Sequence, residues 1–187
     1  MATDEDLIGG VASGDPHALE ELHRRYERPL YQFLYRHTGG RDADDLAQET
    51  WLRVVRAAHR FDRSRRFTTW LFQIALNLSR DWHRRAPPLP VGDGDVPGAA
   101  FQPDTAADGA SGLGSTGATD AGLDARRLLA ALPEAQRSVV VLRYFHDCSE
   151  DEVAEILGCP RGTVKSRMHH AMSRLTALAR EGGERMP

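Results

Sequence analysis

The side chains best suited to chemistry in this sequence are arginines that lie close to aromatic residues. Arg63, Arg65 and Arg66 lie in one short segment between Phe61 and Phe67. Guanidinium groups bind phosphates and aromatic rings stack on unpaired bases, so this composition is typical of a surface that holds single-stranded nucleic acid. A core position is the alternative interpretation for both phenylalanines, and Phe67 is the better candidate for the core.

A helix predicted over about residues 68–85 follows this segment and carries a polar side. Polar residues recur three or four positions apart, as one helix face requires: Arg66, Thr69, Gln73, Asn77, Arg80 and Arg84. Apolar residues form a second stripe, which we interpret as one buried face: Phe67, Trp70, Leu71, Ile74, Leu78 and Trp82.

A second basic surface is predicted near the C-terminus. Residues 150–157, Gly158 and residues 161–181 form a helix, a turn and a longer helix, the order of a DNA-binding helix-turn-helix. The outward side of the longer helix carries groups that bind base edges or phosphates: Thr163, Lys165, Ser166, Arg167, His169, His170 and Arg174. A solvated basic face is the alternative interpretation. The acids of residues 150–155 are expected to face away from phosphates.

A third candidate surface lies on a helix predicted from about Asp42 to about His59. Acids crowd the start of this helix, where they complement the helix dipole. The dipole does not explain why Asp45, Gln48 and Leu52 share one side. A mixed polar and apolar side of this kind favours a protein partner.

Catalytic and metal-binding motifs are missing from the sequence. It contains no G-x-S-x-G, no P-loop and no H-E-x-x-H. Cys148 and Cys159 lack the C-x₂₋₄-C spacing of a structural zinc site, although histidines lie nearby. We therefore predict no catalytic residues, no metal and no cofactor.

The elements that position these surfaces form two modules. The chain has 187 residues and a formal net charge of −3, and residues 87–122 contain 8 glycines and 5 prolines but neither Lys nor Arg. Such a segment buries too little apolar surface to order itself, so we predict a disordered linker there. The domains are predicted as residues 1–86 and 123–187.

Both modules are predicted to be all-α. Asp15 and Pro16 should start a helix that ends at Gly39. The second module should hold helices over 123–132, 134–146, 150–157 and 161–181. No apolar run approaches the length needed to span a bilayer, and two cysteines suit a reducing cytoplasm, where we expect the protein.

Two long segments resemble a known family. Residues 42–52, DADDLAQETWL, the pair Phe61-Asp62 and residues 67–77, FTTWLFQIALN, resemble region 2 of sigma-70-family transcription initiation factors. Residues 132–178, which include GTVKSR at 162–167, are similar to region 4 of the same family. A linker in place of other sigma regions is the layout of the extracytoplasmic-function (ECF) subgroup. The modules are thus expected to be a region 2 helical bundle and a region 4 helix-turn-helix.

The resemblance implies a role for each surface. Region 2 would bind the β′ clamp helices of RNA polymerase core through Asp45, Gln48, Glu49 and Leu52. It would read the melted non-template strand of the promoter −10 element through Phe61, Arg63, Arg65, Arg66, Gln73, Asn77 and Arg80. Region 4 would read the duplex −35 element through the outward residues of helix 161–181 and pack on the β flap. The protein would not itself be an enzyme, and an anti-sigma factor is an expected partner. His170 and Lys165 stand where family members often carry Arg.

Three other interpretations remain open at this stage. A plain helix-turn-helix regulator would bind duplex DNA without polymerase. A redox or metal sensor would use Cys148, Cys159 and the histidines. In the third interpretation, the first module mimics an anti-sigma factor and sequesters polymerase. It would then inhibit transcription instead of activating it.

Overall fold

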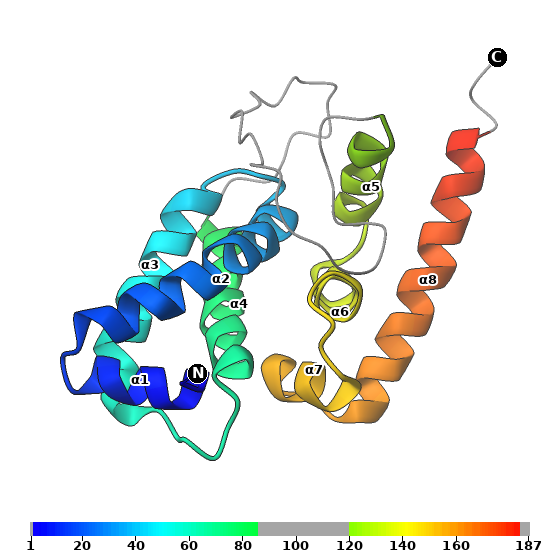
Figure 1. Ribbon diagram of the computed structural model, residues 1–187. Coiled ribbons are helices and arrows are strands. Elements are labelled where there is room, and N and C mark those ends of the chain that lie inside the picture. Colours follow the sequence, from blue (N-terminus) through cyan, green and yellow to red (C-terminus); the bar gives the residue numbers. More distant parts are fainter. Residues whose placement is uncertain (1, 86–119, 184–187) are drawn as a thin grey trace.

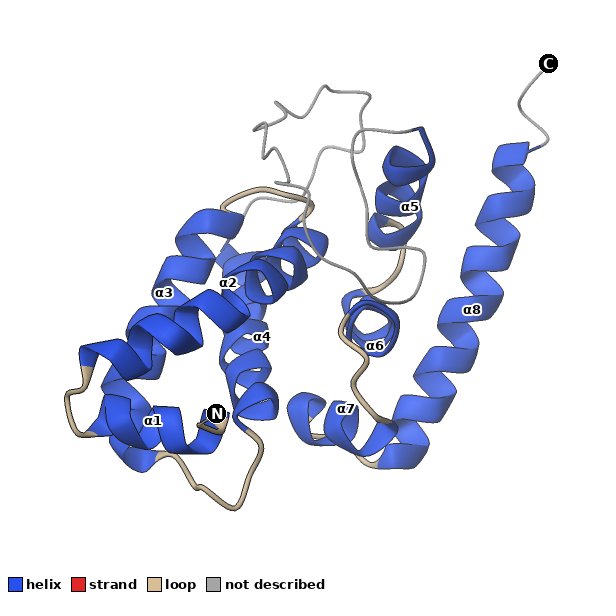
Figure 2. Cartoon of the chain, viewed as in Figure 1, coloured by secondary structure: helices blue, strands red, loops and turns tan. Residues whose placement is uncertain are grey.

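The computed structural model describes residues 2–85 and 120–183, and the elements in these two ranges are all helical (Figures 1 and 2). This confirms the predicted all-α class. The first range holds α1 (Asp4–Ala12), α2 (Pro16–Thr38), α3 (Ala43–Ala57), the 3₁₀ turn η1 (Ala58–Arg60) and α4 (Phe67–Arg85). The second holds α5 (Asp120–Ala130), α6 (Glu134–Phe145), α7 (Glu150–Leu157) and α8 (Arg161–Gly183). We refer to α1–α4 as the first domain and to α5–α8 as the second.

Local signals define α2 as the sequence predicted. Asp15 caps its start by accepting a hydrogen bond from the His17 amide at 2.9 Å, and Pro16 occupies the first helical position. Gly39 ends it in the left-handed conformation, φ 69°. Its inward side chains Leu22 and Phe33 are fully buried.

Helix α1 was not predicted. Thr3 and Asp6 form a capping box at its start, and the Ile8 side chain of α1 is fully buried. An ion pair of 2.6 Å between Asp4 and Arg25 ties α1 to α2.

The predicted single buried face of α4 is only partly right. Leu71 is fully buried, but Trp70, Ile74 and Trp82 are only half-buried. Phe72 and the neighbouring Ala75, Leu76 and Ser79 are buried instead. The reason is tertiary, because α4 contacts α2 and α3 on its own domain and α7 of the second domain (Figure 1).

The second domain contains the predicted helix-turn-helix. Ser149 and Glu152 form the expected capping box of α7, and Gly158 turns the chain in the left-handed conformation before α8. Val164 and Ala171 of α8 are buried. Helix α5 begins at Asp120, three residues earlier than expected. The rest of the predicted linker over 87–122 lies outside the described residues.

The two domains contact each other. Helix α4 lies against α7, and α2 lies against both α5 and α6 (Figure 1). The sequence predicted two modules on a tether and gave no sign of this contact. Among the described helices, none combines the length and apolar character that a bilayer crossing requires.

Candidate functional site

The surface of α3 that was predicted to meet a protein partner is open to solvent. Asp45 and Gln48 are exposed and Leu52 is 47% exposed. Val55, one helical turn further on, is 44% exposed and extends the patch beyond the predicted residues. Two exposed aliphatic side chains beside polar groups form a patch suited to a protein contact.

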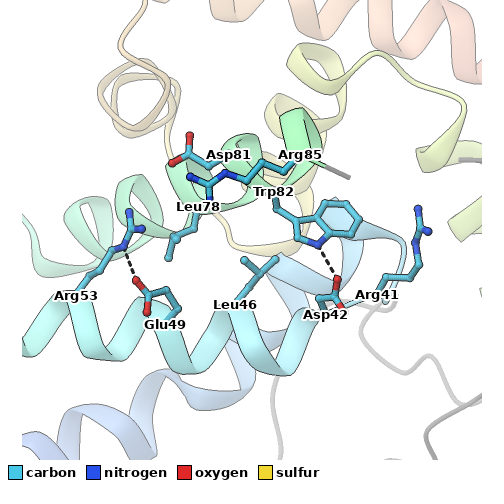
Figure 3. Close-up of a pocket in the computed structure, with 9 residues that line it drawn as sticks. All are labelled: Arg41, Asp42, Leu46, Glu49, Arg53, Leu78, Asp81, Trp82 and Arg85. Atoms are coloured by element: carbon cyan, nitrogen blue, oxygen red, sulfur yellow. Dashed lines mark hydrogen bonds and ion pairs between the residues drawn. The ribbon is translucent and has the colours of Figure 1, made fainter. Parts of the chain in front are cut away.

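Glu49, the fourth residue expected here, lies in a groove between α3 and α4 (Figure 3). It accepts a hydrogen bond from Arg53 at 2.9 Å. The Trp82 indole donates to Asp42 at 2.7 Å, and the Arg41 guanidinium lies 5.5 Å from the Trp82 ring centre. The groove has a volume of about 480 Å³ and is lined by Arg41, Asp42, Leu46, Glu49, Arg53, Leu78, Asp81, Trp82 and Arg85. Its apolar floor and charged rim extend the α3 surface.

Phe61 packs on aromatic neighbours at the start of the arginine-rich segment. Its ring centre lies 5.0 Å from that of Trp70 and 6.2 Å from that of Phe67. Phe67 is fully buried, which confirms its core role, whereas Phe61 is half-buried. Asp62 accepts hydrogen bonds from the Ser64 amide and hydroxyl, and these lower the pKa of Asp62. The turn thus fixes the backbone from which the arginines project.

The polar side of α4 is present with one exception. Asn77 is exposed, and Gln73 and Arg80 are half-buried. Thr69 is only 1% exposed, so its assignment to the polar side was wrong. It faces the core because α4 is covered from several directions.

A second groove connects this side of α4 with α3, and most of its residues are not among the site residues predicted from the sequence. Its volume is about 470 Å³, and it is lined by Arg53, Arg56, Ala57, Arg60, Trp70, Ile74 and Asn77. Three arginines, an aromatic ring and an amide are the groups that hold a nucleotide by its phosphate, base face and base edge. The spacing of Arg53, Arg56 and Arg60 on one helix side could have revealed it.

The outward face of α8 exposes most of the residues that were predicted there. Its exposed residues are Lys165, Ser166, His169, His170 and Arg174, and Thr163 and Arg167 are half-buried. Glu150 of α7 lies near its start, 2.8 Å from Arg161 and 3.8 Å from Lys165. The hydrogen bond from Arg161 is the main reason that the pKa of Glu150 is lowered. Glu150 thus braces the start of the basic helix.

Three of the arginines expected to contact nucleic acid instead pair with carboxylates of the second domain. Arg65 donates to Glu155 at 2.6 Å, and Arg66 pairs with Glu152. Arg80 donates to Glu134 at 3.0 Å. Arg63 is exposed and reaches toward Gly9 on α1.

The cysteines show little sign of reactivity. Burial raises the pKa of Cys148 to about 11, which disfavours its thiolate, the form that reacts or binds metal. Cys159 is half-buried, with its sulfur 3.7 Å from the Arg167 guanidinium. The described residues include no group of three His, Cys, Asp or Glu side chains that could hold a metal ion.

Comparisons with known proteins match both domains. The family model "Sigma-70 region 2" matches residues 22–87, and "Sigma-70, region 4" matches residues 123–175. The ECF RNA polymerase sigma factor SigW of Bacillus subtilis is 33% identical over 178 residues, covering 93% of this chain and 95% of that protein. The ECF RNA polymerase sigma-E factor of Escherichia coli strain K12 is 29% identical and covers 90% of both chains.

Solved structures agree with this likeness. CnrH in complex with the cytosolic domain of CnrY has a TM-score of 0.71 and 26% identity, covering 95% of this chain and 97% of that one. The sigma factor RpoE of Bartonella quintana, in complex with the anti-sigma factor NepR, has a TM-score of 0.65 and 25% identity, covering 86% and 96%.

Proposed function

The chain belongs to the ECF subgroup of the sigma-70 family, and from that membership we propose that it directs RNA polymerase core to promoters carrying −10 and −35 elements. The observation that carries this proposal is the presence of both sigma regions, in order, in one chain. Exposed polar and basic side chains on both regions support the proposal. We place the functional domains at residues 1–86 and 123–187, joined by residues 87–122.

We assign reading of the melted −10 strand to the first domain. Asn77 is exposed on α4 beside Trp70, and Arg53, Arg56 and Arg60 line the same groove. Extracting a base from the stack costs a few kcal/mol, which stacking and arginine–phosphate contacts offset. Arg56 and Arg60 therefore join the residues expected from the sequence.

We assign reading of the duplex −35 element to α8. Its basic residues follow the turn of a helix-turn-helix, so the exposed Lys165 and the half-buried Arg167 would meet base edges or phosphates at the helix start. His170 presents an imidazole ring where family members often carry the guanidinium of Arg. Lys165 carries an ammonium group, which acts as a point charge, where an Arg guanidinium could form two parallel hydrogen bonds.

We assign contact with polymerase core to the open side of α3, around Asp45, Gln48 and Leu52, with Glu49 at its edge. Val55 extends this patch. The sigma factor RpoE of Bartonella quintana was solved with an anti-sigma factor, and we propose a partner of that kind here. The protein would act as a specificity subunit rather than as an enzyme, in the cytoplasm where polymerase works.

Run-off transcription tests the proposal. Bacterial core polymerase and a genomic fragment library are incubated with and without the full chain, and the transcript starts are sequenced. New starts that share a two-part upstream motif support the proposal. No new starts, with a core that responds to another sigma factor, would overturn it and favour a regulator that binds duplex DNA alone.

A further inference from the structure

Helix α1 lies against both ends of the arginine-rich segment at residues 61–66, which we call the −10 loop. It contacts η1, which leads into the loop, and α4, which follows it (Figure 1). The match to the region 2 family model begins at residue 22, so α1 lies outside the matched residues. The helix therefore borders the surface that we expect to hold the −10 strand without belonging to the part of the chain that the family model covers.

The Glu5 side chain of α1 caps the start of α4. One of its carboxylate oxygens accepts a hydrogen bond from the Phe67 backbone amide at 3.0 Å. The first amides of a helix have no partner within the helix, and a carboxylate there also complements the positive end of the helix dipole. Arg66, the residue before α4, has no acceptor in its side chain. The cap is therefore supplied from 62 residues away, and it fixes the point at which the −10 loop ends.

Asp4 holds the same end of α4 through two hydroxyl groups. It accepts a hydrogen bond from the Tyr26 hydroxyl, whose oxygen lies 3.0 Å from Thr68 Oγ1 on α4. A phenol has one proton to donate, so the Thr68 hydroxyl donates to Tyr26. Burial, with a smaller contribution from the bond to Asp4, raises the pKa of Tyr26 to about 12, so its proton stays in place at neutral pH. The Tyr26 ring also packs edge-on against Phe67, with 5.2 Å between ring centres.

The middle of the −10 loop rests on Gly9 of α1. A Cβ atom at Gly9 would overlap the guanidinium of Arg63, which therefore lies directly against the helix. Asp6, about one turn earlier, has its pKa lowered mainly by hydrogen bonds with Thr3 and in smaller part by the charge of Arg63. Glycine at position 9 thus provides the space, and Asp6 an opposite charge, for one arginine of the loop.

We propose that α1 positions the −10 surface, with Glu5 fixing the start of α4 and Gly9 seating Arg63 for the DNA strand. Glu5 and Gly9 are positioning residues, because they act through Phe67 and Arg63 and not by touching DNA. The proposal rests on the proposed function for the identity of the strand. Sequence reading at the −10 element then depends on a helix that the family model does not cover.

Gly9→Ala tests the seat of Arg63 without weakening the helix. Alanine favours a helix more than glycine does, and the new methyl displaces only the end of a flexible side chain. Gly162→Ala is the matched control, since Gly162 also lies in a helix and a Cβ there meets no atom within 4 Å.

Fluorescence anisotropy measures how the full chain binds a labelled mixed-sequence single strand of about 16 nucleotides. Gly9→Ala should weaken binding about threefold to tenfold, the effect of losing one well-placed arginine contact with phosphate. The control should change the affinity by less than about twofold, because its methyl displaces no side chain.

A double-mutant cycle assigns the effect to Arg63. With Arg63→Ala already present, Gly9→Ala should change the affinity by less than about twofold, because the group that it displaces is gone. An equal loss in both backgrounds would show that the effect does not pass through Arg63. That result, or no loss in the wild-type background, would overturn the seating of Arg63 by α1.

Glu5→Ala tests the cap on α4, and Glu20→Ala is its matched control. Glu20 is exposed on α2, and its ion-pair partner His17, at 3.7 Å, is exposed as well. Run-off transcription from the genomic fragment library is the readout, because a mere loss of stability lowers all starts together. Glu5→Ala should instead relax the −10 motif among the starts while the −35 motif stays sharp. Glu5→Gln should restore the −10 motif, because its amide oxygen still accepts from the Phe67 amide.

The outcomes separate this proposal from the proposed function. Starts from Glu5→Ala that carry the wild-type −10 motif, whether fewer or equal in number, would overturn the positioning role of Glu5. Absence of starts with the wild type would overturn the proposed function instead, and the binding cycle would still decide whether Gly9 seats Arg63.

Discussion

Arg80 and Glu134 join the two domains through a hydrogen bond of 3.0 Å between the guanidinium Nε and a carboxylate oxygen. The side chains are about one-third exposed, at 33% and 37%. Arg80 is also a residue that we expect to contact the −10 strand. In this structure the ion pair therefore occupies a guanidinium that we expect to contact DNA.

Salt should loosen this contact. Ion pairs with partly exposed side chains contribute about 0–1 kcal/mol each, and the screening length falls from about 10 Å at 0.1 M to about 3 Å at 1 M salt. We expect the radius of gyration to rise over that range while helix content by circular dichroism stays constant. A radius that stays constant would show that the aromatic contacts alone hold the domains together.

Acid should also open the domains. Burial, and to a smaller extent the charge of Arg36, lowers the pKa of His146 from 6.5 to about 3. Burial, together with Arg137, His83, Arg80 and His146, lowers that of His37 too. These rings are neutral when closed and take up protons on opening. Their contribution is therefore complete above pH 6.5 and is lost as the pH falls from 6.5 toward 3.

At pH 5 the loss for His146 alone amounts to about 2 kcal/mol. Scattering at pH 7.5 and pH 5 should show expansion, and His146→Phe should reduce the response because it keeps the ring against Phe72 without the titration. A wild-type radius that is the same at both pH values, with the helices intact, would contradict this account.

The sequence predicted those elements whose ends carry local signals. Asp15 with Pro16 defines one helix start, and Gly158 defines the turn before α8. Helix α1 was missed because its nine residues include a glycine pair and carry only a short apolar pattern. The capping residue Thr3 with Asp6 was the available signal.

The contact between the domains could not be predicted from the sequence. Arg65 and Glu155 are 90 residues apart, and no local pattern pairs them. Thr69 was misplaced for the same reason, since its burial depends on helices distant in the chain. Arg56 and Arg60 lie at helical spacing, but the denser cluster of Arg63, Arg65 and Arg66 gives the stronger signal in the sequence.

Asn77 and Arg167 should separate the two promoter elements. Asn77→Ala should reduce run-off transcription about tenfold or more by loss of −10 contacts, and Arg167→Ala should cost about 1–3 kcal/mol and relax the −35 sequence preference. Arg180→Ala, at an exposed position near the end of α8, is the control and should match the wild type. If both variants reduce thermal stability, their losses are structural and the assignments are wrong.

Leu52 should contribute to polymerase binding without contributing to folding. It is 47% exposed, so Leu52→Ser should change the free energy of unfolding by less than about 0.5 kcal/mol. Capture of core polymerase by the variant should fall by about tenfold, as expected for an apolar residue at an interface centre. Val55→Ser tests whether the patch continues along α3. Capture equal to that of the wild type for both variants would exclude this side of α3.

Gly158 and Gly162 should respond oppositely to the same substitution. Gly158 has φ 63° in the turn of the helix-turn-helix, and a Cβ there would meet no atom within 4 Å. Gly158→Ala should therefore cost about 1–2 kcal/mol from backbone conformation alone. Gly162 lies in α8 with equally open space around it, so Gly162→Ala should stabilise the chain by about 0.5–1 kcal/mol. Chemical denaturation of the two variants measures both. Equal losses would mean that crowding, rather than backbone angle, governs this turn.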